Sequence, residues 1–206
     1  DEWGVDVTVS GSQKGLMMPA GLSFNAVSAR AMERHRTATL PRSYWDWSQM
    51  AQFNDDGFFP YTPATNLLYG LAEALSMLEE EGIDRVFARH ARFAEATRRA
   101  AKVWGLANVA AIEAESSNSV TALFAPDGVD ANELRRVILE RFDMSLGSGL
   151  GDLAGRAFRI GHLGDLNDLT LIGTLGGVEM GLELAGVPYT AGGAQAAMDF
   201  MTETLQ

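Results

Sequence analysis

A lysine in a glycine-containing turn has the position and the chemistry of a reactive amine. Residues 5–9 form a short valine-rich run that predicts a β-strand, and the sequence Ser-Gly-Ser-Gln leads from its end to Lys14. Strand ends commonly border a ligand crevice in α/β sheets. A desolvated lysine there can lose its proton and attack a carbonyl, as Schiff-base lysines do. The alternative is a solvated surface lysine, the usual fate of this residue type.

Two more side chains have positions that suit the binding of an anion. Thr62, in the run Pro-Tyr-Thr-Pro at 60–63, precedes a predicted helix, and helix N-termini favour negative charge. A plain N-cap is the alternative for this threonine. Arg159 is a lone cation in an apolar strand predicted over residues 157–161, so it needs a negative partner. A substrate carboxylate would fit its planar fork, but a structural Asp or Glu partner would look the same in sequence.

Four segments of the chain resemble the class V pyridoxal-phosphate-dependent aminotransferases. Residues 10–16, 18–21, 59–65 and 158–165 occur in the family's order and at similar separations, and the likeness is greatest to the serine–glyoxylate and alanine–glyoxylate branch. The resemblance implies an α/β fold, the C-terminal portion of a fold-type I aminotransferase. It has one departure, because a position that is often tyrosine in the family is Phe59 here, which cannot donate a hydrogen bond.

The resemblance also assigns roles to four residues. It implies that Lys14 binds pyridoxal 5′-phosphate as a Schiff base and moves the α-proton of the substrate. Gln13 and Thr62 would contact the cofactor phosphate, Thr62 in the site of a partner subunit across a two-fold interface. Arg159 would anchor the carboxylate of each substrate in turn. His162 would shape the site rather than act as a base.

The implied reaction is transamination of an amino acid, with serine favoured, and glyoxylate to give glycine and a 2-oxo acid. Alanine–glyoxylate and ureidoglycine–glyoxylate transamination are alternative enzyme functions. A third alternative is a truncated, catalytically incompetent fragment, because complete enzymes of the family are about twice this length. The half without a counterpart here would carry the phosphate-cradling turn, the aromatic that stacks on the cofactor ring and the aspartate that pairs with the pyridine nitrogen.

Composition limits the remaining function classes. The 206 residues carry a formal net charge of −11, which argues against a general nucleic-acid surface. There is no cysteine and only three scattered histidines, so the sequence offers no recognisable metal site. No apolar run approaches the roughly 20 residues of a membrane span, and no basic-then-apolar leader begins the sequence. We therefore expect amino-acid and 2-oxo-acid substrates, a homodimer with shared active sites, and a cytoplasmic location without membrane contact.

The pattern of elements predicts two domains. Two strands and a long helix ending near residue 81 are expected to be the remnant of a large cofactor-binding domain, with that helix as the hinge. Residues 82–206 alternate helices and strands, which predicts a small α/β domain. The aromatic stretch 39–60 has no clean period and is expected to be an irregular loop.

Several side chains have less specific expectations. The glycine-rich residues 147–151 imitate a dinucleotide loop but lack its final glycine, and they are expected to form a flexible turn near the mouth of the site. His35 and His90 lie among arginines and are expected at the surface. The arginines expected on the outward face of the helix predicted over residues 83–106 are Arg89, Arg92, Arg98 and Arg99.

Overall fold

The computed structural model describes residues 2–205 and divides the chain into two compact units, residues 1–80 and 81–206. Each unit is described by itself. The sequence placed this division one residue later, after residue 81. The identity of the first unit as the remnant of a cofactor-binding domain stays a prediction. No helix in the described part of the chain is long and apolar enough to cross a membrane.

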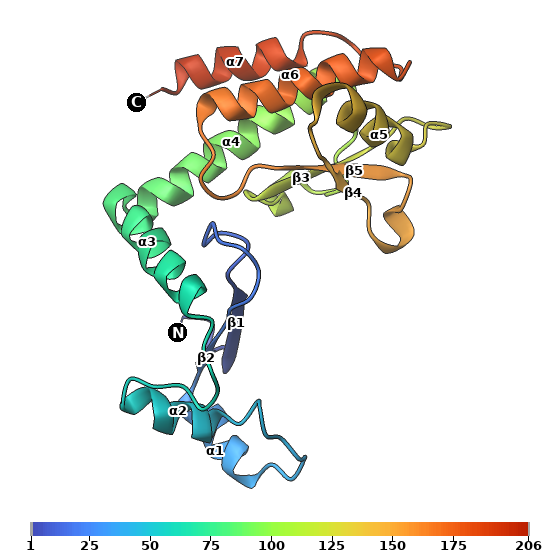
Figure 1. Cartoon of the computed structure of the whole chain (residues 1–206). Coiled ribbons are helices and arrows are strands. Elements are labelled where there is room, and N and C mark those ends of the chain that lie inside the picture. The colour runs from blue at the N-terminus through green and yellow to red at the C-terminus, as the bar shows by residue number, and fades with distance from the viewer. Residues whose placement is uncertain (1, 206) are drawn as a thin grey trace. The chain divides into compact units, whose positions relative to one another are not determined.

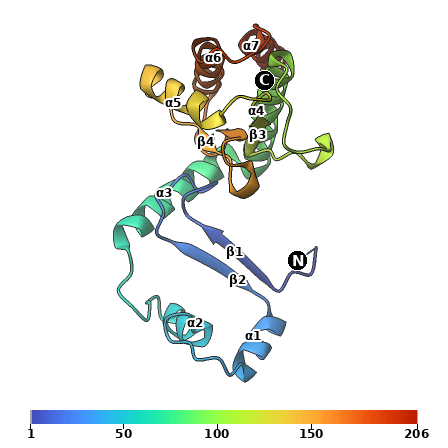
Figure 2. The ribbon, with the colours of Figure 1, turned by 90° about the vertical axis from the view of Figure 1, so that its right-hand side faces the viewer.

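The first unit begins with an antiparallel strand pair. Strands β1 (Val7–Gly11) and β2 (Ser23–Val27) are aligned so that Val7 faces Val27 and Gly11 faces Ser23. The β-branched residues of the valine-rich run favour this extended backbone. Strand β1 continues two residues beyond the predicted end at residue 9, so the lysine turn starts after Gly11. Figure 2 shows β1 and β2 lying side by side.

Two short helices follow. Helix α1 (Ala29–Thr37) is capped by Ser28, whose hydroxyl accepts a hydrogen bond from the Ala31 amide, a role that serine favours. Helix α2 (Trp47–Asp55) corrects the expectation of an irregular stretch over residues 39–60. Asp46 caps this helix through the Gln49 amide, but none of the helix residues is buried. With no buried face, α2 has no apolar period by which the sequence could reveal it.

Helix α3 (Thr65–Glu81) completes the first unit and ends where it was predicted to end. Gly82 follows it with φ +85°, a left-handed conformation that glycine adopts without steric cost. Leucines recur at helical spacing along α3, which indicates a buried face, but only Ala74 of this helix is buried and Leu75 is 43% exposed.

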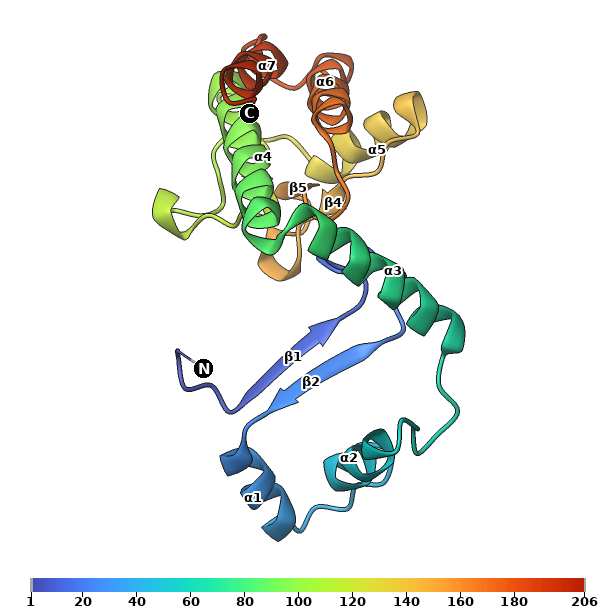
Figure 3. The same ribbon diagram turned by 90° about the vertical axis from the view of Figure 1, so that its left-hand side faces the viewer.

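The second unit is a layer of helices over a small antiparallel sheet. Its strands are β3 (Val120–Phe124), β4 (Gly147–Ser148) and β5 (Ala157–Gly161), in the order β3-β5-β4. Helices α4 (Ile83–Trp104), α5 (Ala131–Phe142), α6 (Asp168–Leu184) and α7 (Gly193–Glu203) lie on one side of it (Figures 1 and 3). Two short 3-10 helices, η1 (Glu113–Glu115) and η2 (Gly151–Leu153), lie in the connections. The layered α/β arrangement confirms the predicted fold class.

The hydrophobic core lies between this sheet and its helices. Phe158 and Ile160 of β5 are fully buried and belong to one cluster with Trp104 of α4. Arg159 lies between them in sequence and is only half-buried. Successive side chains of a strand point to opposite faces, so the face of β5 away from the core carries the arginine.

Two arginines of helix α4 that were predicted to face solvent form ion pairs with other segments. Arg89 makes a bidentate ion pair with Glu81 (Nε–Oε1 2.6 Å, Nη2–Oε2 2.8 Å) and also donates to the Gly164 carbonyl at 2.8 Å. Hydrogen bonding from Arg89 holds the pKa of Glu81 below its usual value. Arg92 makes an ion pair with Asp168 through one terminal nitrogen, at 2.5 Å. Arg89 and Arg92 thus connect α4 to other segments, which corrects the outward assignment for these two. Arg98 and Arg99 pair with Glu95 of the same helix, and Arg99 is exposed as predicted.

His35 and His90 are buried, so their surface assignment is wrong. The Nδ1 of His90 lies 2.7 Å from the Val86 carbonyl, and its Nε2 accepts a hydrogen bond from the Gly164 amide at 3.0 Å. His35 contacts Asp46 at 3.3 Å and lies beside the Trp47 ring. His35 therefore joins α1 to the start of α2, and His90 joins α4 to a segment more than seventy residues away, contacts that a local pattern of arginines could not indicate.

His162 makes stability depend on pH. Its ring is fully buried, with Nε2 2.9 Å from the Thr121 hydroxyl and Nδ1 3.2 Å from the Asn118 carbonyl. Burial lowers the pKa of His162 from 6.5 to about 4. Below pH 6.5 His162 is therefore protonated in the unfolded chain, whereas in the folded protein it stays neutral until the pH approaches 4. The free energy of unfolding should fall as the pH drops from 6.5 towards 4, by about 3 kcal/mol in total.

Urea unfolding at pH 7.5, 6.0, 5.0 and 4.5, compared with His162→Gln, measures this contribution. Subtracting one profile of unfolding free energy against pH from the other cancels the contribution of the carboxylates that both proteins share. The original protein should lose more stability than the variant across this window. Parallel profiles would contradict a neutral, buried His162.

Candidate active site

The lysine turn is organised by a buried serine. Ser12 is completely buried, and its hydroxyl donates to the Pro19 carbonyl at 2.7 Å and accepts from the Leu22 amide at 3.2 Å. The Ser12 carbonyl also accepts from the Met18 amide at 3.2 Å. One side chain thus closes the loop between β1 and β2 from within. The sequence indicated a turn here but not that Ser12 holds it, because the partners lie six to ten residues away.

Lys14 lies at the exposed tip of this closed turn. Its carbonyl accepts a hydrogen bond from the Met17 amide at 2.9 Å, and Met17 has φ +58°, a conformation uncommon outside glycine. The Lys14 side chain is exposed and makes no hydrogen bond or ion pair with another described residue. The backbone is fixed while the amine is free to react. The desolvated surroundings considered for it are not supplied by the described residues.

Gln13 folds back over Gly11. A Cβ placed on Gly11 would lie 2.7 Å from the Gln13 side-chain oxygen, so the amide would have to turn away from a side chain at this position. Gln13 and the adjacent Lys14 are both exposed. The turn thereby carries an amine and an amide donor on consecutive residues.

Thr62 is not the N-cap of the helix that follows it. Helix α3 starts at Thr65, and its first helical hydrogen bond runs from the Leu68 amide to the Ala64 carbonyl at 3.1 Å. Within the described residues the exposed Thr62 hydroxyl has no hydrogen-bond partner. The capping alternative is therefore excluded, and the hydroxyl is available to a ligand.

The nearby aromatic residues do not replace the tyrosine of the family pattern. The Tyr61 hydroxyl lies 3.2 Å from the Ser43 hydroxyl, and its ring packs on Tyr44 with centroids 5.0 Å apart. Phe59 is exposed and has no polar atom on its side chain. The contact that the family often makes with tyrosine has no donor at the corresponding position.

Arg159 has no acidic partner among the described residues. Its Nε donates to the Ser148 carbonyl at 2.8 Å, and no ion pair joins it to an Asp or Glu of the described chain. Among the described residues there is therefore no carboxylate that would give Arg159 a purely structural role. With Nε occupied, the two terminal nitrogens remain for a ligand, and two parallel N–H groups suit a carboxylate.

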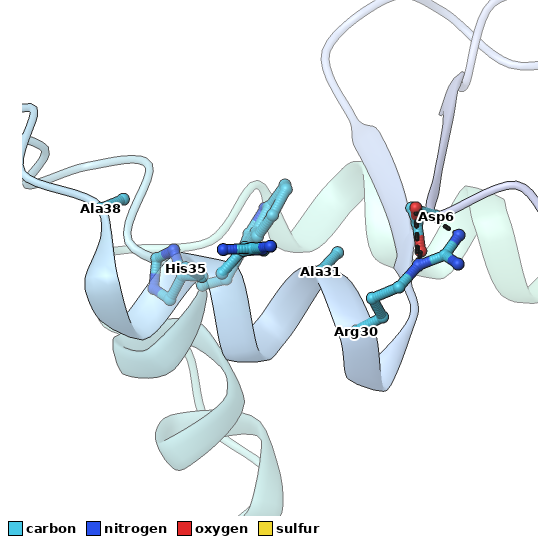
Figure 4. A pocket seen from close by; sticks show the side chains of 7 residues that line it. Asp6, Arg30, Ala31, His35 and Ala38 are labelled. Carbon is cyan, nitrogen blue, oxygen red and sulfur yellow. Dashed lines mark hydrogen bonds and ion pairs between the residues drawn. The ribbon is translucent and has the colours of Figure 1, made fainter.

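A hollow elsewhere in the first unit has a different character. It has a volume of about 510 Å³ and lies along α1 (Figure 4). At its rim Arg30 and Asp6 form an ion pair at 2.7 Å, and hydrogen bonds from Arg30 and Ser28 hold the pKa of Asp6 low. None of the four predicted site residues lines it. Its lining residues are Asp6, Arg30, Ala31, Arg34, His35, Ala38 and Trp47.

The predicted residues suit pyridoxal phosphate by the chemistry of their donors. Lys14 supplies a free primary amine for the cofactor aldehyde, and the Gln13 amide and the unpartnered Thr62 hydroxyl can donate to a phosphate. Lys14 and Gln13 share one turn, Thr62 lies in another segment of the same unit, and Arg159 lies in the second unit.

Several known proteins that are similar to this chain in sequence or in fold are aminotransferases. The chain is 47% identical to serine–glyoxylate aminotransferase of Methylorubrum extorquens and 42% identical to L-aspartate–glyoxylate aminotransferase of Paracoccus denitrificans, covering 98% and 99% of this chain and 52% of each relative. The crystal structure of ureidoglycine–glyoxylate aminotransferase from Bacillus subtilis superposes with a TM-score of 0.86 at 28% identity, over 98% of this chain and 53% of that one. No protein-family profile matches the sequence.

These comparisons confirm the predicted class: the fold matches the C-terminal half of a fold-type I aminotransferase, and the relatives are class V aminotransferases. Within that class, the sequence relatives include serine–glyoxylate and aspartate–glyoxylate aminotransferases. The chain spans about half the length of the curated relatives it matches.

Proposed function

We propose that this chain carries the lysine and the carboxylate anchor of a pyridoxal-phosphate-dependent aminotransferase that transfers the amino group of serine to glyoxylate, giving glycine and a 2-oxo acid. The observation that carries the proposal is the free, exposed amine of Lys14 in a turn locked by Ser12. Serine is favoured as donor because the 47% identical relative is a serine–glyoxylate aminotransferase.

Each residue would have a defined part in this reaction. Lys14 would hold the cofactor through its amine, and the same amine would move the proton at the substrate α-carbon. The cofactor supplies an electron sink for that carbon. Gln13 and Thr62 donate hydrogen bonds to the phosphate. Arg159 binds the carboxylate shared by amino acids and 2-oxo acids, which orients both substrates the same way.

The proposal includes a homodimer and a cytoplasmic location. In it, the segment containing Thr62 serves the phosphate site of the partner subunit. The exposed hydroxyl of Thr62 and the exposed aromatic residues around it support such an interface, since large apolar side chains at the surface often mark contact sites. Sedimentation of the chain with and without cofactor would test the dimer.

A donor survey tests the reaction. Serine, alanine, aspartate and ureidoglycine are each offered with glyoxylate, and glycine formation is followed over time. We expect the highest kcat/KM with serine. Glycine formed from another donor but not from serine would replace the serine assignment with one of the alternatives and leave the transaminase assignment in place.

A catalytically incompetent fragment is the second candidate function. The observation that favours it is that the chain spans only about half the length of its relatives. The two candidates differ in whether this chain takes up pyridoxal phosphate. A visible absorbance band that forms on cofactor addition and is absent in Lys14→Ala supports the enzyme, and no band supports the incompetent fragment.

A further inference from the structure

We propose that Gly147 is a positioning residue for Arg159. The absence of a side chain at position 147 lets the guanidinium lie across β4 with both terminal nitrogens free for a carboxylate. This inference rests on the proposed function only where it concerns the substrate. The placement of the arginine is a property of the chain itself and can be tested without catalysis.

The pairing of β4 with β5 places the two residues directly opposite each other. Gly147 is the register partner of Arg159 in this antiparallel pair. A Cβ built on Gly147 would lie 3.1 Å from the Cβ of Arg159, 3.1 Å from its Nε and 3.4 Å from its Cζ. These distances are tighter than ordinary contacts between side chains, so an alanine at 147 forces Arg159 to move.

The backbone of Gly147 does not itself require glycine. Its φ lies outside the left-handed region, unlike that of Gly151, which is +54°. An L-residue would therefore adopt this conformation without strain. The space that the missing side chain leaves is the feature that matters at Gly147.

The strand that carries Gly147 is held in place. The Leu146 carbonyl accepts a hydrogen bond from the Arg135 Nε at 2.9 Å, and the Leu146 side chain is buried. Beyond the strand, the Gly149 amide donates to the Ala157 carbonyl at 2.9 Å. This pairing corrects the expectation of a flexible turn over residues 147–151. Because β4 is anchored on both sides, β4 and β5 can part by only a few tenths of an ångström around a methyl group at 147. The larger movement therefore falls to the flexible end of the Arg159 side chain.

The movable part of Arg159 is its guanidinium. Its Cβ is fixed by the backbone of the central strand, whereas the end of the side chain can rotate. Rotation away from a methyl group at 147 breaks the hydrogen bond from Nε to the Ser148 carbonyl, which is 2.8 Å long. The terminal nitrogens then lose the orientation that a bidentate carboxylate contact requires. A misplacement of about 1 Å in such a contact can cost about a hundredfold in rate.

The first test observes the arginine directly. In a ¹H–¹⁵N spectrum of the labelled chain, the Nε–H of Arg159, assigned by its loss in Arg159→Lys, should exchange slowly with solvent because it is hydrogen-bonded. Gly147→Ala should shift this signal and speed its exchange. Gly173→Ala is the matched control, since a Cβ on this helical glycine meets nothing within 4 Å, and it should leave the signal unchanged.

The second test uses transamination. Gly147→Ala should raise the KM of both the amino donor and glyoxylate by about tenfold to a hundredfold, with kcat changed much less. The visible band of bound cofactor should stay, because Lys14 is untouched. A substitution that merely loosened the fold would instead lower the active fraction and kcat at unchanged KM.

The outcomes separate the two proposals. An Arg159 Nε–H that exchanges freely in the unsubstituted chain overturns the inference, even if Gly147→Ala does not fold. A protected signal that Gly147→Ala leaves in place, with unchanged KM values, also overturns it. A chain without transaminase activity removes the proposed function, while the exchange of the Nε–H still decides whether Gly147 positions Arg159.

Discussion

Replacing Lys14 with alanine is expected to lower transamination by at least about 10²–10⁴-fold, the usual contribution of one positioned proton-transfer group. The expected loss is at the upper end because the same amine also holds the cofactor. The buried Ser12 closes the turn through its own hydrogen bonds, so the turn should keep its shape without the lysine side chain. The measurement is the initial rate of glycine formation at saturating substrate.

Lys102 provides the matched control for this substitution. It is the only other lysine of the chain and lies exposed in the last turn of α4. Lys102→Ala removes the same functional group and the same charge, yet it should leave the rate nearly unchanged. Equal losses in the two variants would show that the effect follows from lysine content or charge and not from the position of Lys14.

Glu179→Ala is expected to have the largest effect on stability, on the order of 4 kcal/mol. Three donors converge on this carboxylate: the Trp104 Nε1 at 3.0 Å, the Gly192 amide at 2.5 Å and the Ala194 amide at 2.7 Å. Burial of Glu179 raises its pKa, but these hydrogen bonds lower it by more and hold the pKa below its usual value. Without the carboxylate, a buried indole N–H and the start of α7 lose their acceptor.

Chemical denaturation at pH 7 measures this loss, and Glu140→Ala is the comparison. Glu140 pairs with Arg136 on the exposed side of α5, where ion pairs contribute little. Glu179→Gln should be intermediate, since its amide keeps one oxygen but turns an NH₂ group towards the donors. A Glu179→Ala variant as stable as Glu140→Ala would mean that water replaces the carboxylate.

Sequence reasoning could single out Lys14 as a candidate because the relevant signals are local. A valine-rich strand, a glycine turn and the neighbouring residues of the family pattern all lie within about ten residues of Lys14. The same holds for the strand that carries Arg159, whose bounds of 157–161 agree with β5. The roles of these residues remain proposals, because no ligand contact follows from the chain alone.

The features that the sequence missed depend on distant partners. His90 bonds the Gly164 amide and Arg89 the Gly164 carbonyl, contacts that span more than seventy residues. Nothing near His90 in the sequence distinguishes a buried ring from a surface one. Likewise, of the glycine-rich residues 147–151, Gly147 and Ser148 form strand β4 only because β5 lies beside them. The glycine content of this stretch indicates a flexible backbone, but it cannot reveal the pairing with β5.

Borohydride reduction of the chain with pyridoxal phosphate, followed by peptide mapping, tests the central claim most directly. Reduction fixes the cofactor on whichever amine holds it, and the sequence offers only two lysine side chains. The account predicts a label on the peptide that contains Lys14, at stoichiometry well above that on Lys102, and its loss in Lys14→Ala. Equal labelling of both lysines, or none on Lys14, would contradict it.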